Sequence, residues 1–153
     1  LHWYYEIDQL GYKYNMNDLM ASIGISQLAK LKKFNLQREK ILVKYLNGIS
    51  NLKSFKPTFP YILRNSSYWL FSIRTKKRDQ LVSFLRKKNI STAVHFVPLP
   101  LNKLYKKYKG SVKNSLKVWK EIVSLPFFPD LEDKKINYII KCLKLFDRKN
   151  FNG

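Results

Sequence analysis

Apolar residues recur at three- and four-residue steps through most of residues 17–48, which predicts one long amphipathic helix. The residues of this stripe are Met20, Ile23, Leu28, Leu31, Phe34, Ile41, Leu42 and Tyr45. Asn17 is a good N-cap and Gly48 is placed to end the helix. At 1.5 Å per residue the helix is roughly 45 Å long. A small domain cannot cover that length, so we expect part of the helix to pack on something else.

Two features beside this stripe bear on its packing. Residues 1–16, which precede the helix, are aromatic and irregular, and we interpret them as an interface segment. Gly24 lies inside the helix, where glycine costs about 1 kcal/mol relative to alanine. Close approach of another backbone would explain this glycine, and simple tolerance of it by the helix would explain it equally well.

The pattern along residues 49–147 predicts a small α/β domain. Residues 68–75 alternate like a strand, with Trp69, Phe71 and Ile73 on one face. A short helix over 77–89 and a second strand over 90–97 follow, and Asn89 is a plausible left-handed cap between them. This βαβ-type order predicts a right-handed crossover between parallel strands.

The remaining pattern predicts a helix over 112–123, an extended edge segment over 124–129 and a last helix over 132–146. The apolar side of the first helix is formed by Leu116, Trp119, Ile122 and Val123. The apolar side of the last helix has five residues at helical spacing: Ile136, Ile139, Ile140, Leu143 and Phe146. Residues 148–153 read as a frayed tail.

Charge raises the question of an anionic partner, because the 153-residue chain carries a formal net charge of +20. The excess is mostly lysine and is scattered along the chain, whereas base readout favours arginine. A solvated basic surface and attraction to anions or nucleic acid both remain open, with nucleic acid the less favoured partner. No apolar run is long enough for a membrane helix, and the single cysteine, Cys142, fits a buried apolar position in a cytoplasmic protein.

Self-contained chemistry is hard to find in this sequence. It lacks a Gly-rich phosphate loop, a nucleophile elbow, an HExxH zinc motif and a convincing catalytic pair of carboxylates. His95, near the end of the second predicted strand, is the one residue that could act chemically by itself. If Val94 and Phe96 face the core, His95 points away from it, as either an ordinary surface histidine or a ligand contact.

Three segments, in order, resemble the DegT/DnrJ/StrS family of sugar aminotransferases. They are "GYKYNMNDLMASIGISQLAKL", "YWLFSIRTKKRDQLVSFLRKKNISTAVHFVPLPLNKLY" and "SLPFFPDLEDKKINYIIKCL". The resemblance implies the C-terminal small domain of a fold-type-I transferase that depends on pyridoxal 5'-phosphate. Such enzymes form homodimers and transfer an amino group from glutamate to a nucleotide-linked keto sugar. The family's Schiff-base lysine motif is not matched here, so we expect this chain alone, which begins at Leu1, to be an inactive fragment.

The resemblance also implies site residues. Lys13 matches the family asparagine that contacts the cofactor phosphate of the partner subunit, and Asn15 stands at the family's arginine position. His95 matches the family histidine of the nucleotide-sugar pocket, with Tyr14 and Trp3 as weaker substrate candidates. The alternatives are a small basic nucleic-acid-binding domain and a dimerisation fragment without catalytic function.

Overall fold

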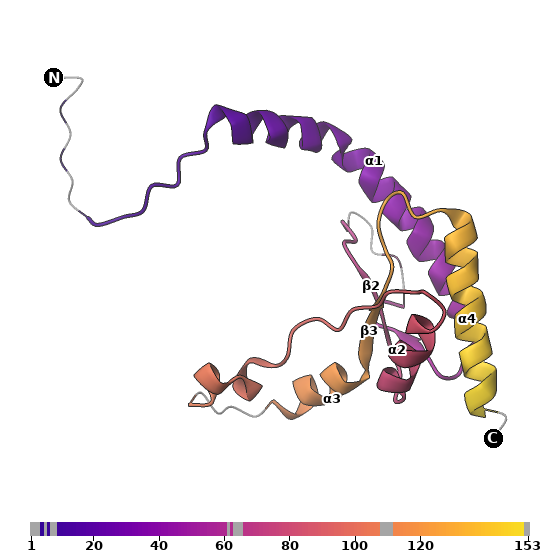
Figure 1. The fold of residues 1–153 in the computed structure, drawn as a ribbon. Helices are drawn as coiled ribbons and strands as arrows, with labels where there is room; N and C mark the ends of the chain where they lie inside the picture. Colours follow the sequence, from indigo (N-terminus) through magenta and orange to yellow (C-terminus); the bar gives the residue numbers. More distant parts are fainter. Residues whose placement is uncertain are drawn as a thin grey trace. The chain divides into compact units, whose positions relative to one another are not determined.

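The computed structural model describes residues 4, 6, 9–60, 62, 66–107 and 112–151 (Figure 1). The elements within them are α1 (Asp18–Ile49), β1 (Lys56–Pro57), β2 (Phe71–Arg74), α2 (Arg78–Arg86), the 3-10 turns η1 (Leu99–Leu101) and η2 (Lys103–Tyr105), α3 (Lys113–Glu121), β3 (Ile122–Leu125) and α4 (Asp133–Phe151). Four helices and a three-stranded sheet confirm the predicted α/β class.

The long helix is also confirmed, and its N-terminus shows why it starts where it does. The Asn17 side chain accepts a hydrogen bond from the Met20 backbone N–H at 2.9 Å, which caps one of the free amides of the first turn. The chain divides into two compact units, residues 1–32 and residues 33–153, so the boundary falls inside α1. The predicted boundaries lay instead at the two ends of this helix.

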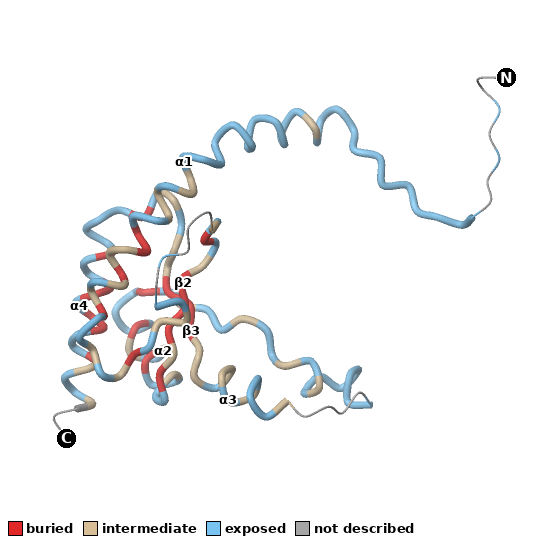
Figure 2. The backbone as a smooth tube through the Cα atoms, turned by 180° about the vertical axis from the view of Figure 1, so that it is seen from behind, coloured by how far each residue is buried: buried red, intermediate tan, exposed pale blue. Residues whose placement is uncertain are grey.

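The buried residues of residues 33–153 gather on the sheet, α2, α4 and the C-terminal part of α1 (Figure 2). Tyr45 of α1 is completely buried among them. Its ring stacks on Phe71 of β2, with the centroids 4.8 Å apart and the planes at 1°. Its hydroxyl donates to the carbonyl oxygen of Pro126 at 2.9 Å, and burial raises the pKa of this phenol. One side chain of α1 therefore joins the helix to β2 and to the chain that follows β3.

Helix α4 lies beside the C-terminal half of α1 (Figure 1) and follows its predicted periodicity. All five of its predicted apolar residues are buried, as is Cys142. A Cβ added to Gly48 of α1 would lie 2.6–2.9 Å from three carbons of Ile140, so this glycine lets the two helices approach closely. Gly48 is helical and does not end α1. Helix α4 continues to Phe151, so residues 148–151 are helical and not part of a frayed tail.

The sheet has the order β1-β2-β3, and both pairs are antiparallel. The predicted parallel crossover is therefore wrong. Residues 90–97 do not form a strand beside β2. Within this segment only Ala93 pairs, and it forms an isolated antiparallel bridge to Ser124 of β3. Backbone geometry explains the failure, because Phe96 has a φ of 49° and Pro98 and Pro100 follow, so an extended ladder cannot continue.

Strand β3 replaces the predicted second strand. Its residues Ile122 and Val123 were assigned to the end of a helix, but α3 stops at Glu121. In β2, Phe71, Ser72 and Ile73 are all buried, so both faces of this strand are covered. Trp69, predicted to share a face with Phe71 and Ile73, lies before the strand and is 68% exposed, whereas the other two are buried.

Candidate functional site

The segment that carries His95 is shaped by the break in the predicted strand. Two hydrogen bonds fix Ala93 to Ser124, with N···O distances of 3.1 and 2.8 Å. Three residues later, Phe96 adopts a left-handed backbone conformation and is 83% exposed. A bulky aromatic residue at positive φ is a true outlier, and such strain costs on the order of 1–3 kcal/mol. Strained residues cluster at ligand sites, so this turn marks a candidate site.

The strained turn settles an orientation that the sequence left open. Val94 is 39% exposed and Phe96 is more exposed still, so neither faces the core. His95 is half-buried instead. Its ring lies 6.0 Å from the ring of Trp69, at an angle of 47° between the planes. Two residues outside regular strands, Trp69 and His95, are thus brought together at one surface.

A cavity of about 550 Å³ opens beside His95. It is lined by residues 95–99 on one side and by one face of α3 with Ile122 on the other. Most of the lining is apolar, and the polar groups are the His95 imidazole, the Asn114 amide and the Ser115 hydroxyl. An apolar cleft with a few convergent polar groups is the usual form of a small-molecule site.

Trp119 of α3 lines the same cavity, and its indole N–H lacks a hydrogen-bond partner among the described residues. The indole ring forms a cation–π contact with Arg78, the first residue of α2, whose guanidinium carbon lies 5.6 Å from the ring centroid. Arg78 also pairs with Asp79 at 2.6 Å. Helix α2 therefore supports one wall of the cavity.

The predicted phosphate residues belong to the other unit, residues 1–32. Lys13, Tyr14 and Asn15 are exposed and lie in an extended stretch just before α1. The rings of Tyr12 and Tyr14 lie 5.8 Å apart. An ammonium and an amide suit phosphate oxygens, but nothing described in this unit would hold a pyridine ring. These residues fit the phosphate end of the cofactor only, and Trp3 lies outside the described residues.

Among the described residues, the histidine, cysteine, aspartate and glutamate side chains form no group of three or more that could bind a metal ion. No helix in the described part of the chain combines the length and apolarity needed to cross a bilayer.

Sequence reasoning missed part of the cavity. Asn114 and Ser115 were ordinary polar positions of a predicted helix, and Trp119 was assigned to its apolar side. None of the residues of α3 is fully buried, because this apolar side faces a cavity and not a packed core. The useful signal was the pair of prolines after His95, since they showed where the strand had to stop.

The α/β fold is shared with solved sugar aminotransferases, of which the chain covers about 40% of the length. The chain belongs to the DegT/DnrJ/EryC1/StrS aminotransferase family, whose model matches residues 2–144. Aminotransferases of this family depend on pyridoxal phosphate.

Two curated relatives and one solved structure illustrate the match. The protein MJ1066 of Methanocaldococcus jannaschii is 35% identical, over 97% of this chain and 41% of its own. The spore coat polysaccharide biosynthesis protein SpsC of Bacillus subtilis is 28% identical, over 93% and 39%. The pyridoxal-phosphate form of Spr1654 from Streptococcus pneumoniae superposes with a TM-score of 0.83 at 29% identity, over 96% and 40%. The chain thus spans about 40% of the length of these relatives.

Proposed function

We propose that this chain is the C-terminal part of a cytoplasmic, homodimeric nucleotide-sugar aminotransferase. The enzyme would transfer an amino group from glutamate to a keto sugar carried on a nucleotide. The observation that carries the proposal is the family match over residues 2–144. The name of the Bacillus subtilis relative SpsC, a polysaccharide biosynthesis protein, supports a sugar substrate.

In this proposal His95 binds and orients the sugar nucleotide. A half-buried imidazole beside Trp69 and a largely apolar cavity can donate to or accept from a sugar hydroxyl while the ring faces the apolar wall. The strained backbone at Phe96 would fix the direction of the imidazole before the substrate arrives. Such preorganisation lowers the entropy cost of binding.

Lys13 would hold the phosphate of a cofactor bound by the partner subunit, acting as a point charge, with Asn15 as polar support. Tyr14 and Trp3 would extend the substrate pocket. When bound, pyridoxal phosphate supplies the electron sink that amino transfer requires, and it is held mainly by protein outside this chain. The role of this chain is to position two anionic groups, the cofactor phosphate and the nucleotide.

An interface along α1 follows from exposed apolar side chains. Met20, Ile23, Leu28 and Leu31 of the predicted stripe are all exposed within the described chain. A contiguous apolar face of this kind marks a surface that another protein part covers. We propose that the large domain and the partner subunit cover it.

A hybrid enzyme tests the proposal. The part of Spr1654 that precedes the matched region is joined to this chain, since 96% of the chain superposes on that protein. With pyridoxal phosphate, the hybrid should take the amino group from glutamate, seen as loss of the cofactor's visible absorbance. The chain alone should form no borohydride-reducible adduct with pyridoxal phosphate. A reducible adduct on the chain alone, or an inert hybrid that is folded and dimeric, would contradict the proposal, and the second result would favour a dimerisation fragment.

Matched variants of the hybrid separate the two roles. His95→Ala should raise the KM for the nucleotide sugar by about tenfold, which corresponds to 1.4 kcal/mol, and leave the glutamate half-reaction unchanged. Lys13→Ala should weaken cofactor binding, with Lys30→Ala as the control on α1. Mixing the Lys13→Ala hybrid with one that lacks the Schiff-base lysine should restore normal cofactor affinity, because the intact Lys13 of one subunit then serves the other. Failure of the mixture to recover would show that Lys13 does not act across the interface.

A further inference from the structure

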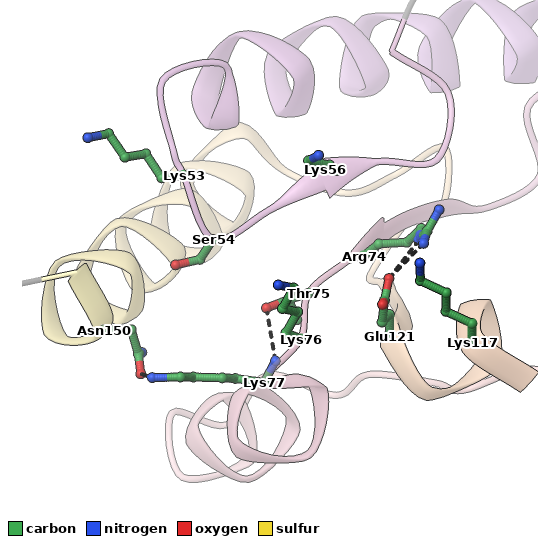
Figure 3. Close-up of a pocket in the computed structure, with 10 residues that line it drawn as sticks. All are labelled: Lys53, Ser54, Lys56, Arg74, Thr75, Lys76, Lys77, Lys117, Glu121 and Asn150. Carbon is green, nitrogen blue, oxygen red and sulfur yellow. Dashed lines mark hydrogen bonds and ion pairs between the residues drawn. The ribbon is translucent and has the colours of Figure 1, made fainter.

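A second cavity, of about 580 Å³, lies in residues 33–153 and is strongly basic (Figure 3). Three separate stretches of the chain form it: residues 53–56, residues 74–77 and one face of α3, with Asn150 of α4 at the rim. Its charged residues are six cations, namely Lys53, Lys56, Arg74, Lys76, Lys77 and Lys117, and one carboxylate, Glu121. Fold geometry thus concentrates lysines that look scattered in the sequence.

The one carboxylate that lines the cavity, Glu121, already forms an ion pair with Arg74. Glu121 Oε2 accepts hydrogen bonds from Arg74 Nη2 at 2.7 Å and from Arg74 Nε at 3.1 Å. This bonding, with Lys117 and Lys76 nearby, holds the pKa of Glu121 below its usual value. Lys56, Lys76 and Lys117 form no ion pair with any described residue. The cavity therefore keeps a large uncompensated positive charge.

Hydrogen bonds to α4 hold the rim of the cavity in place. Lys77 Nζ donates to Asn150 Oδ1 at 2.8 Å, and the Asn150 amide donates to the carbonyl of Phe146 at 2.7 Å. The Ser54 N–H donates to Asp147 Oδ1 at 2.8 Å. Gathering like charges on such a fixed frame is unfavourable for folding alone. A bound anion would remove that penalty.

We propose that this cavity binds a small polyanion that carries two adjacent phosphate groups. A single phosphate would leave part of the charge of Lys56, Lys76 and Lys117 uncompensated, whereas a diphosphate reaches several cations at once. A long polyanion such as nucleic acid favours a continuous basic stripe, but here the cations line one cavity of the size that holds a small molecule. The diphosphate could be free or could belong to a nucleotide.

This site is separate from the cavity at His95, because different residues of α3, on neighbouring faces of the helix, line the two. Lys117 and Glu121 face the basic cavity, and Val118 and Trp119 face the other. Residues four apart share one face of a helix, and the intervening residues lie on another. The inference therefore does not rest on the proposed aminotransferase function, and either can fail alone.

Isothermal titration calorimetry of the whole chain at about 0.15 M salt tests the inference, with inorganic pyrophosphate, inorganic phosphate and ADP as probes. We expect pyrophosphate to bind more tightly than phosphate. Lys76→Ala and Lys117→Ala should each weaken pyrophosphate binding about two- to fivefold, toward the upper end of what one exposed charge pair contributes. The matched controls are Lys141→Ala and Lys144→Ala, which remove exposed lysines of α4 outside the cavity and should change the affinity less than about twofold. Thermal unfolding checks that all four variants stay folded.

The outcomes separate the ligand sources. Equal affinity for pyrophosphate and ADP assigns the site to a diphosphate group as such, and tighter ADP binding assigns it to a nucleotide. His95→Ala should leave both affinities unchanged. The inference is overturned if pyrophosphate does not bind, if the control lysines matter as much as the cavity lysines, or if only single-stranded RNA binds.

Discussion

Gly48 offers a direct test of how α1 packs against α4. Gly48→Ala adds one carbon, and that Cβ would meet Ile140 Cδ1 at 2.6 Å, Cγ2 at 2.8 Å and Cγ1 at 2.9 Å. Ordinary contacts of a Cβ begin near 3.4 Å. The three carbons belong to both branches of the isoleucine, so rotating its side chain replaces one clash with another.

Two opposing effects decide the sign of the substitution. Alanine in place of glycine inside a helix stabilises by about 1 kcal/mol. Overpacking a filled core destabilises by about 1–3 kcal/mol. Three simultaneous close contacts with a buried residue place Gly48→Ala toward the upper end of that range. We therefore expect the free energy of unfolding to fall by about 1–2 kcal/mol.

Urea denaturation followed by far-ultraviolet circular dichroism measures this effect. Gly24→Ala is the matched control, since it lies in the same helix with no atom within 4 Å of the added carbon. It should raise helicity and leave the midpoint unchanged or higher. The same open surroundings mean that no described part of this chain explains Gly24 by close approach.

A double-mutant cycle identifies the cause. In an Ile140→Ala background the space around Gly48 is free, so Gly48→Ala should become neutral or stabilising there, a coupling of about 1–3 kcal/mol. Two results would refute the reasoning. One is a Gly48→Ala protein that is stabilised as in the control, and the other is an equal loss of stability in both backgrounds.

Three further predictions concern single side chains. Tyr45→Phe should lower the free energy of unfolding by about 1 kcal/mol in urea, because the partly buried hydrogen bond to the Pro126 carbonyl is lost; no change would show that water replaces the hydroxyl. The Arg74 contact lowers the pKa of Glu121 from 4.5, so it stabilises the fold above about pH 4.5 and its contribution is lost as the pH falls; Glu121→Gln should flatten this acid limb in pH-dependent unfolding, and an unchanged limb would contradict the pairing. Phe96→Gly should keep or slightly raise the melting temperature despite loss of an aromatic ring, since glycine accepts the positive φ; a clear drop would show that the ring packs.

Helices were predictable here because each carries a local signal. The periodicity of α1 and α4, the Asn17 cap and the left-handed Asn89, with a φ of 57°, could all be read from neighbouring residues. Such signals depend on contacts within about one turn of helix. They need no knowledge of the tertiary fold.

Strand pairing was not predictable, because it depends on which segment, distant in the sequence, pairs with β2. Residues 90–97 and 122–125 are both short and apolar, and periodicity cannot choose between them. Residues 90–97 cannot form the strand, because the backbone of Phe96 leaves the extended region. No glycine or asparagine beside Phe96 indicates this positive φ in the sequence. The basic cavity was hidden for the same reason, since its lysines come from three stretches that only the sheet brings together.

The unit boundary inside α1 has a thermodynamic consequence. Residues 33–49 are anchored by core side chains such as Tyr45, whereas the apolar stripe of residues 18–32 is exposed. A helical segment of this length is only marginally stable when nothing packs on it. Its amide hydrogens should therefore exchange rapidly in the isolated chain and become protected once a partner surface arrives. Winding of the first half of α1 and assembly of the enzyme would then be one coupled equilibrium, which hydrogen exchange can follow residue by residue.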